Sequence, residues 1–498
     1  MDRRARTIMF QGTGSGVGKS VAAAAFCRVL ARRGVRVVPF KAQNMALNSF
    51  VTPDGKEMGR AQVFQAEACG LAPDVRMNPI LLKPSADAAS QVIVMGEAVG
   101  HYSARAYYQE FEAHRRVARE AFDALAAEYE VVVLEGAGSP AEINLQDTDL
   151  VNMDMAAHAR APVVLVGDID RGGVFAWIKG TYDLIPEAHR GLVAGFLVNK
   201  FRGDPGLLRP GIEAFARLVP VPCLGVLPMF RDIEVDQEDG VHVEALERRG
   251  ARRPIRVVVV RPERISNFTD FGSLAAEPDV SLVFARRPEE AEGADCLVLP
   301  GTKATMADLE ILRRAGWGEA LAAAAADGVP VVGLCGGYQM LGEEILDPAG
   351  VEGGPARVAG FGLLPVVTEM APAKVLARTR AVTAGGGLLP GGLPAEGYEI
   401  HMGRTRASGE VRPLFEGRGP GLGCRAPGGD VLGTYLHGLF DADGLRHAFL
   451  DALRRRRGLA PLGERPAWRA ARAAHLDRLA DWLEAHADLP RLLALVGL

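Results

Sequence analysis

Short apolar runs alternate along this chain with longer stretches in which apolar residues recur at helical spacing. Because parallel strands need long crossover connections, which are usually helical, this rhythm predicts an α/β fold with mostly parallel sheets. Helices are expected between the strands, for example at Ser20–Arg32 and Ala104–Tyr129. In the first half of the chain the predicted strands are Thr7–Phe10, Val35–Phe40, Val131–Leu134, Pro162–Val166, Leu192–Val198 and Leu224–Leu227.

A polar stretch with no sustained apolar strand, residues 233–254, divides the chain into two α/β domains, 1–232 and 255–445. The glycine-rich tract Gly385–Gly392 in the second domain predicts a surface loop. Residues 446–498 carry Ala, Leu and Arg at helical spacing, which predicts a tail of packed helices whose arginines face solvent. The predicted strands of the second domain are Ile255–Val260, Ser281–Phe284, Asp295–Leu299, Val329–Gly333 and Val431–Leu436.

Composition and charge narrow the classes of partner. A chain of 498 residues is too long for one hydrophobic core, which agrees with two domains. Lys and Arg number 57 against 61 Asp and Glu, so we expect neither a nucleic-acid nor a membrane partner. The six cysteines form no CxxC pair, which favours a cytoplasmic, reducing location. The sequence leaves open whether the protein forms a homo-oligomer.

A glycine-rich loop, GTGSGVGKS from Gly12 to Ser20, lies between the first predicted strand and helix. Backbone N–H groups of such a loop can approach a phosphate closely, Lys19 can contact the β- and γ-phosphate oxygens, and Ser20 can bind Mg²⁺. The loop is one residue longer than GxxxxGK[ST], a form that resembles dethiobiotin synthases. The expected ATP-binding residues in the loop are Gly12, Thr13, Gly14, Gly16, Gly18, Lys19 and Ser20.

Polar residues at the ends of later strands are further candidates, because open α/β sheets bind ligands at the carboxyl ends of their strands. Glu135 follows the VVVL strand, and the resemblance to dethiobiotin synthases implies that it holds Mg²⁺ together with Ser20. The same resemblance implies that Asn199 binds the adenine edge of ATP. Asp168 and Asp170 form an acidic pair that either contributes to the site or caps a helix.

The second domain carries a nucleophile elbow. The sequence VVGLCGGYQM, residues 331–340, predicts a strand, a sharp glycine turn and a helix, with Cys335 at the turn. A helix N-terminus favours a thiolate, which can attack the γ-amide of glutamine while backbone N–H groups bind the oxyanion. The expected oxyanion donors are Gly336 and Thr302, the latter in the PGT loop that follows Leu299.

A cysteine nucleophile needs a base close to it in space. His437, in the late segment GTYLHG, is the preferred candidate, and His401, in GYEIHMG, is the alternative. The elbow, the PGT loop and the late histidine together resemble class I glutamine amidotransferase domains. Most such domains carry a glutamate two residues after the histidine, where this chain has Leu439. The resemblance therefore implies a Cys–His dyad and leaves the group that orients His437 unassigned.

Joined to the dethiobiotin-synthase-like half, the whole chain resembles the cobyric acid synthase family. The resemblance runs nearly end to end, in stretches such as PFKAQNMALNSFVTPDGKEMGRAQ, VVVLEGAGSPAEINL, GDIDRGGVF, RISNFTDF and YLHGLF. It implies ATP-driven, glutamine-dependent amidation of the b, d, e and g carboxylates of adenosylcobyrinic acid a,c-diamide through acyl phosphates. Further candidates for the ATP-domain site are Lys41, Gln43, Asn44 and Asn48. The alternatives are a cobyrinic acid a,c-diamide synthase and a non-catalytic ATP-dependent switch.

Overall fold

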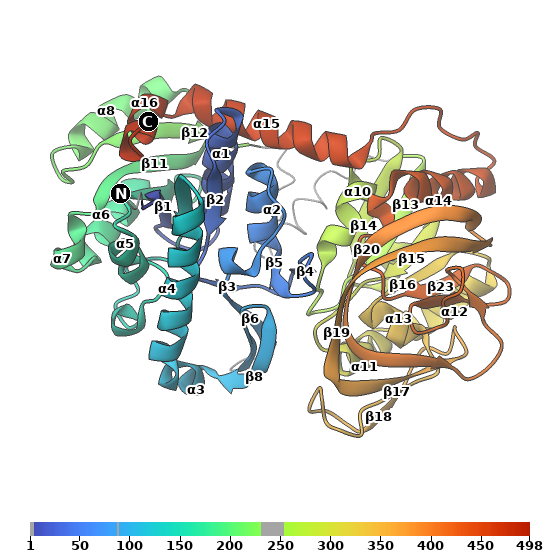
Figure 1. Cartoon of the computed structure of the whole chain (residues 1–498). Coiled ribbons are helices and arrows are strands. Elements are labelled where there is room, and N and C mark those ends of the chain that lie inside the picture. Colours follow the sequence, from blue (N-terminus) through green and yellow to red (C-terminus); the bar gives the residue numbers. More distant parts are fainter. Residues whose placement is uncertain (1–3, 87–88, 231–252) are drawn as a thin grey trace. The chain divides into compact units, whose positions relative to one another are not determined.

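The computed structural model of the chain describes residues 4–86, 89–230 and 253–498 (Figure 1). Their contacts divide the chain into two compact units. Unit 1 comprises Met1–Ala46, Lys56–Glu238 and Arg472–Leu498, and unit 2 comprises Leu47–Gly55 and Asp239–Ala471. Most of the predicted connection at 233–254 lies outside the described residues. Among the helices that are described, none combines the length and hydrophobicity needed to cross a bilayer.

Unit 1 is built on a six-stranded parallel sheet, as the apolar rhythm predicts. The strands β1, β9 and β10 at its centre are almost entirely buried, because helices cover both faces of the sheet. In sheet order the strands are β12 (Cys223–Pro228), β11 (Val193–Phe201), β10 (Val163–Asp168), β1 (Arg6–Gly12), β9 (Val131–Glu135) and β2 (Val37–Phe40). Between β1 and β12 along the chain, the helices of at least seven residues are α1 (Lys19–Arg32), α2 (Arg60–Ala68), α4 (Phe111–Glu128), α5 (Met153–Ala159), α6 (Val174–Leu184) and α8 (Pro205–Phe215).

A second sheet in unit 1 does not follow the predicted βαβ rhythm. Its strands, in order, are β3 (Gln43–Met45), β6 (Ile80–Ala86), β7 (Ala89–Val94) and β8 (Glu97–Ser103), and β6, β7 and β8 are antiparallel. The helix predicted at Ala104–Tyr129 is two helices, because α3 (Ala104–Gln109) ends before α4 begins. Shorter elements of this unit are β5 (Glu57–Gly59), η1 (Val75–Met77), η2 (Gln146–Thr148) and α7 (Glu187–Arg190).

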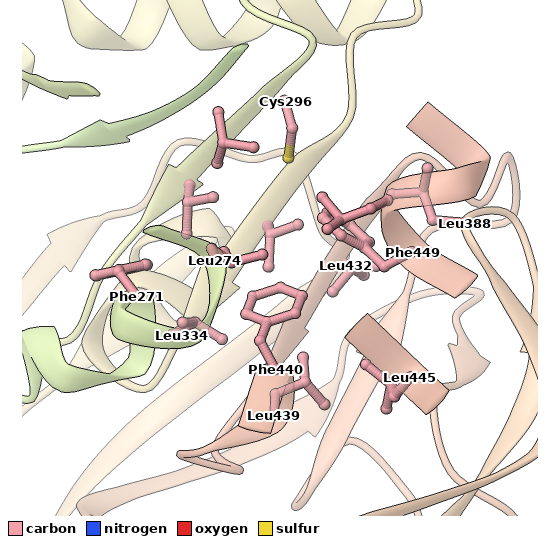
Figure 2. Packing of buried hydrophobic residues seen from close by; sticks show 14 of the residues in the cluster. Phe271, Leu274, Cys296, Leu334, Leu388, Leu432, Leu439, Phe440, Leu445 and Phe449 are labelled. Carbon is pink, nitrogen blue, oxygen red and sulfur yellow. The ribbon is translucent and has the colours of Figure 1, made fainter. Parts of the chain in front are cut away.

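Unit 2 contains a seven-stranded sheet with five parallel strands and an antiparallel edge. Alternate residues of its strand β13 enter two different core clusters, Val257 and Val259 on one face and Val258 and Val260 on the other. The first cluster is closed by Phe271, Leu274, Phe440 and Phe449 (Figure 2). In sheet order the strands are β14 (Val280–Ala285), β13 (Ile255–Val260), β15 (Cys296–Leu299), β16 (Val331–Leu334), β23 (Val431–Thr434), β22 (Gly423–Arg425) and β21 (Arg412–Pro413).

Several of the helical segments of unit 2 carry polar residues discussed below. They are η3 (Phe268–Phe271), α10 (Gly272–Ala275), η4 (Pro288–Ala291), α11 (Thr305–Arg314), α12 (Trp317–Ala326), α13 (Gly336–Leu341), η5 (Leu439–Asp441) and α14 (Asp443–Arg456). The unit also contains the short strand β4 (Ser49–Val51).

A long antiparallel hairpin in unit 2 was not predicted. Strand β19 (Val366–Gly386) pairs with β20 (Leu389–Ala407), and β17 (Glu344–Leu346) and β18 (Arg357–Ala359) complete its sheet (Figure 1). The prediction of a surface loop at Gly385–Gly392 is therefore wrong. The glycines form the tight turn of the hairpin, where Gly385, Gly386 and Gly387 have positive φ, and Leu388 and Leu389 are buried.

The C-terminal residues do not form a separate tail. Helix α14 places Leu445, Phe449 and Leu453 in the core of unit 2. Of the last helices, α15 (Trp468–His486) and α16 (Leu489–Leu495), the residues from Arg472 onward belong to unit 1. Their side chains Leu479, Leu483 and Leu492 lie in the same hydrophobic cluster as Ile8 and Phe26.

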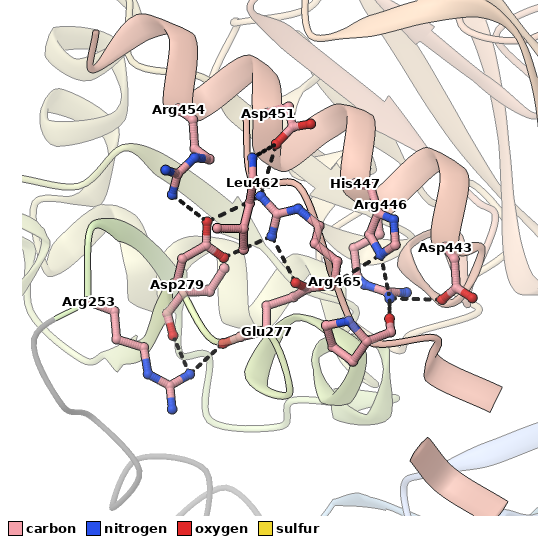
Figure 3. Close-up of polar contacts among 12 residues, drawn as sticks. Arg253, Glu277, Asp279, Asp443, Arg446, His447, Asp451, Arg454, Leu462 and Arg465 are labelled. Atoms are coloured by element: carbon pink, nitrogen blue, oxygen red, sulfur yellow. Dashed lines mark hydrogen bonds and ion pairs between the residues drawn. The ribbon is translucent and has the colours of Figure 1, made fainter. Parts of the chain in front are cut away.

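The expectation that the C-terminal arginines face solvent is wrong for two of them. Arg446 is fully buried and pairs through Nε with Oε1 of Glu277 at 2.6 Å (Figure 3). Arg465 lies 2.8 Å from Oε2 of the same carboxylate and 2.8 Å from Asp279. These arginines are required inside because Glu277 and Asp279 are themselves buried and would otherwise be unpaired charges.

Breaking this buried pair should destabilise the protein. Replacing Arg446 with Ala leaves Glu277 with one fewer cation in a buried site, so the free energy of unfolding should fall by about 3–5 kcal/mol. Urea unfolding measures the change. As a control, Arg314→Ala removes an exposed pair with Glu310 and should change stability by less than about 1 kcal/mol. Equal effects of the two substitutions would contradict the prediction.

Candidate active site

Cys335 lies at a strand-to-helix turn, as predicted. Strand β16 ends at Leu334, helix α13 begins at Gly336, and Cys335 between them has φ 52° and ψ −109°. A side chain at positive φ is strained, and such strain is typical of nucleophile elbows. The turn also needs a glycine at 337, because a Cβ there would lie 2.1 Å from the carbonyl oxygen of Leu299.

His437 lies close enough to Cys335 for the two side chains to interact electrostatically, and the Cys335 thiol donates to the carbonyl oxygen of Ile400 at 3.6 Å. His437 follows strand β23, is buried, and exchanges two backbone hydrogen bonds with Tyr398, whose ring stacks on the imidazole at 5.2 Å. His401 lies elsewhere in the hairpin. Its ring stacks on Tyr435, and its nitrogens lie 2.8 Å from the Gly403 carbonyl oxygen and 3.5 Å from Glu399. The geometry therefore favours His437 as the base.

The group that orients His437 is Asp270, in the 3₁₀ helix η3. Its Oδ2 lies 2.7 Å from Nδ1 of His437, and its Oδ1 accepts a hydrogen bond from the backbone N–H of Gly438 at 2.8 Å. With Nδ1 occupied by the carboxylate, Nε2 is the nitrogen available to the thiol. Cys335, His437 and Asp270 thus form a triad rather than a dyad.

Sequence reasoning missed Asp270 because its partner lies 167 positions further along the chain. Most class I domains place the carboxylate two residues after the histidine, but Leu439 at that position packs into the hydrophobic core. The only signal was the stretch RISNFTDF, which contains a single acidic residue close to the predicted PGT loop in space.

The surroundings of His437 favour its charged form. Burial alone would lower the pKa of the imidazolium, but the Asp270 carboxylate and the Cys335 thiol raise the pKa of His437 to about 10. The imidazolium therefore persists at neutral pH and is lost only as the pH rises through about 10.

The predicted oxyanion donors lie against the elbow. A Cβ placed on Gly336 would be 3.1 Å from the backbone N of Thr302, so the two chain segments are in contact. A Cβ on the neighbouring Gly301 would be 3.5 Å from Cε1 of His437. The hydroxyl of Thr302 is hydrogen-bonded to Asp308, which fixes the PGT loop. The structure thus brings Cys335, His437, Gly336 and Thr302 together.

The glycine-rich loop of unit 1 connects β1 with α1. Gly16 and Gly18 have positive φ, and a Cβ on Gly18 would lie 2.1 Å from Nδ2 of Asn199, so only glycine fits there. Lys19 donates to the carbonyl oxygens of Gly14 and Gly138 at 2.9 and 3.0 Å. The predicted residues Gly12, Thr13, Gly14, Gly16, Gly18 and Asn199 thus lie around Lys19 or on the same loop.

Ser20 and Glu135 lie side by side beneath this loop. The Ser20 hydroxyl donates to Oε1 of Glu135 at 2.7 Å, and the Lys41 ammonium lies 2.9 Å from the same oxygen. Burial alone would raise the pKa of Glu135, but Lys41, Ser20 and Lys19 outweigh it and lower the pKa, so the carboxylate is ionised. The acidic pair at the next strand end is neutralised, because Asp168 pairs with Lys200 and Asp170 with Arg202.

A pocket of about 410 Å³ opens beside the loop, within unit 1. Ser15 and Gly138 line one side, and the exposed apolar side chains of Met45, Tyr108 and Leu145 line another. The candidates Gln43 and Asn44 also line it. Asn48 is not among the residues that line this pocket, and its contacts group it with unit 2.

Comparisons with known proteins identify a known domain family for each half of the chain. The CobB/CobQ-like glutamine amidotransferase domain matches residues 256–445, and the CobQ/CobB/MinD/ParA nucleotide binding domain matches residues 8–243. Fold and site therefore define an ATP-dependent glutamine amidotransferase. Cobyric acid synthase of Syntrophobacter fumaroxidans is 49% identical over 99% of both chains. Cobyric acid synthase of Desulforudis audaxviator is 50% identical, over 99% of this chain and 100% of the relative's chain. The chain belongs to the cobyric acid synthase family, which acts in cobalamin biosynthesis.

Replacing Asp270 with Asn should impair glutamine hydrolysis and shift its pH dependence. Without the carboxylate, Nδ1 loses its charged acceptor, so kcat for glutamate release should fall by about 10²–10⁴-fold. The alkaline limb should also move down from about 10 toward 6.5, the ordinary pKa of the imidazolium. Rates of glutamate release across this pH range test both effects. Glu399→Gln, which changes the carboxylate beside His401, is the control, and an unmoved limb in Asp270→Asn would count against the triad.

Proposed function

We propose that this chain converts adenosylcobyrinic acid a,c-diamide to adenosylcobyric acid by amidating its b, d, e and g carboxylates. Glutamine supplies the nitrogen at Cys335, and ATP activates each carboxylate at the glycine-rich loop. The observation that carries the proposal is the contact of Cys335, His437 and Asp270 at a nucleophile elbow, in a chain that also holds a phosphate-binding loop. The six cysteines are free thiols, which supports a reducing, cytoplasmic location.

Glutamine hydrolysis follows from the geometry of the triad. The Cys335 thiolate attacks the γ-carbonyl carbon, and backbone N–H groups of Gly336 and Thr302 stabilise the oxyanion. His437 gives its proton to the departing nitrogen, so ammonia leaves and a thioester remains. Water then attacks the thioester with His437 as base, which releases glutamate and restores the thiol. Asp270 keeps Nδ1 protonated throughout.

Carboxylate activation would occur at the loop of unit 1. A substrate carboxylate oxygen attacks the γ-phosphorus of ATP, ADP leaves, and ammonia then displaces phosphate from the acyl phosphate. Lys19 is buried beside the loop, where it can offset the phosphate charge. Ser20 and the ionised Glu135 offer oxygen ligands that fit Mg²⁺, which would neutralise further phosphate charge. Asn199, next to Gly18, remains our candidate for the adenine edge.

The 410 Å³ pocket is our proposed site for the edge of the corrinoid that carries the reacting side chain. It borders the loop at Ser15 and Gly138, so a carboxylate bound there would lie near the phosphates. Its exposed Met45, Tyr108 and Leu145 offer an apolar surface to a largely apolar macrocycle. Asn44 is buried, and its Nδ2 has no hydrogen-bond partner among the described residues, so it can donate to a substrate oxygen.

The mass of the product tests the reaction. Purified protein with ATP, Mg²⁺, glutamine and the diamide corrinoid should give a product with four more amides, detected by mass spectrometry. Cys335→Ser should lose this activity with glutamine and keep it with ammonium salts, because added ammonia bypasses the thiol. Lys19→Ala should lose both activities. In a parallel assay with cobyrinic acid as substrate, amidation only at a and c would instead identify a diamide synthase. An unaffected Cys335→Ser variant would favour a non-catalytic switch.

A further inference from the structure

Helix α11 begins directly behind the predicted oxyanion donor Thr302, and its first residue is Thr305. A Cβ placed on Gly336 would lie 3.1 Å from the backbone N of Thr302 and 3.2 Å from Oγ1 of Thr305. The first turn of α11 is therefore packed against the nucleophile elbow. Because only two residues separate Thr302 from Thr305, a shift of that turn moves the N–H of Thr302 relative to Cys335.

A carboxylate from a distant loop holds this first turn. The first N–H groups of a helix have no partner within the helix. In α11, the N–H of Thr305 donates to Oε1 of Glu352 at 2.9 Å, and the N–H of Met306 donates to Oε2 of Glu352 at 2.9 Å. Both oxygens of Glu352 are thus used on one helix terminus, where a negative charge also suits the positive end of the helix dipole.

The loop that carries Glu352 is itself held in a defined conformation. It follows strand β17, and its first residue, Asp347, is buried. The Asp347 carboxylate accepts the N–H of Val351 at 2.7 Å and the N–H of Glu352 at 2.9 Å. One buried carboxylate therefore fixes the backbone of the residue that supplies the other, and Glu352 is presented to α11 in a defined position.

The position of α11 is passed to Thr302 through a further carboxylate. Asp308 lies in α11, is buried, and accepts a hydrogen bond from the Thr302 hydroxyl. On the other side of the PGT loop, the N–H of Ser266 donates to the carbonyl oxygen of Gly301 at 2.9 Å. The loop is therefore held between the segment at Ser266 and α11. The helix end that Glu352 holds decides where the N–H of Thr302 lies.

We propose that Glu352 is a positioning residue for the oxyanion donor Thr302. By holding the first turn of α11, it sets where the N–H of Thr302 lies when the γ-carbonyl oxygen of glutamine becomes an oxyanion. Both Glu352 oxygens already accept N–H groups of α11, so we assign the carboxylate to the helix and not to the ammonium group of glutamine. This inference rests on the proposed function, which gives Cys335 and Thr302 their roles.

The first test is the kinetics of glutamate release by the full-length protein. Glu352→Ala should lower kcat about 10- to 100-fold, because a donor displaced by about 1 Å loses most of its effect on the oxyanion. KM for glutamine should change by less than about twofold, since the lost interaction belongs to the transition state. Glu352→Gln keeps one oxygen acceptor for α11, so its kcat should fall only about three- to tenfold.

Two controls accompany these variants. Glu310→Ala removes a carboxylate from a half-exposed position of the same helix, where it pairs with Arg314, and should behave as wild type. Ammonium-dependent amidation should stay at the wild-type rate in all three variants, because added ammonia bypasses the glutaminase site.

A second measurement separates the oxyanion from the thiol. Alkylation by iodoacetamide forms no oxyanion, so Cys335 of Glu352→Ala should be alkylated at the wild-type rate, followed by mass spectrometry of the peptide that contains it. Glutamate γ-semialdehyde adds to a thiol as a tetrahedral adduct that resembles the transition state. Its inhibition constant should therefore rise by about the factor by which kcat/KM falls.

An unchanged kcat in Glu352→Ala would overturn the inference. So would a higher KM at unchanged kcat, which would assign Glu352 to glutamine binding, and so would slower alkylation of Cys335, which would show a disturbed thiol. If Glu352→Ala also loses ammonium-dependent amidation, Glu352→Gln decides, and an unchanged kcat in that variant would overturn the inference. Continued glutamine hydrolysis by Cys335→Ser would instead overturn the proposed function.

Discussion

The buried hydrogen bond between Asp270 and His437 is the interaction on which the glutaminase site depends. It joins the short 3₁₀ helix η3, which follows the first strand of the seven-stranded sheet along the chain, to the segment after β23, the fifth parallel strand of that sheet. An isolated buried carboxylate would be costly, and so would an isolated buried imidazolium. Each is tolerated here because it lies 2.7 Å from the other. The pair in turn keeps a positive charge beside the sulfur of Cys335.

Buried charges are also compensated by neighbouring groups at the phosphate-binding loop of unit 1. Glu135 lies beneath the loop with Lys41 and Ser20 as neighbours, so its negative charge is already compensated in the protein alone. Lys19 is likewise held by carbonyl oxygens of Gly14 and Gly138. These contacts preorganise both signs of charge close to where phosphate oxygens would lie, which reduces the reorganisation needed for catalysis.

The sequence predicted those parts of the molecule whose signals are local. Parallel strands buried on both faces are continuous apolar runs, so β1, β9 and β13 were recognisable, and glycine spacing identified the loop before Lys19 and the elbow at Cys335. The hairpin β19–β20 was missed, because its register depends on pairing across the two strands rather than on a local sequence pattern. Asp270 and the segment Leu47–Gly55 were missed because their partners are distant in sequence and no short pattern encodes them.

The burial of the final helices within unit 1 has a consequence for biosynthesis. Leu479, Leu483 and Leu492 complete a hydrophobic core whose other members include residues near the N-terminus. During translation, the first sheet therefore keeps part of its apolar surface uncovered until residues 479–492 have been synthesised, whereas the core of unit 2 can close earlier. A nascent chain therefore has all of the glutaminase before it has a finished nucleotide-binding unit, and a chain that lacks residues 479–492 would have an incomplete ATP half.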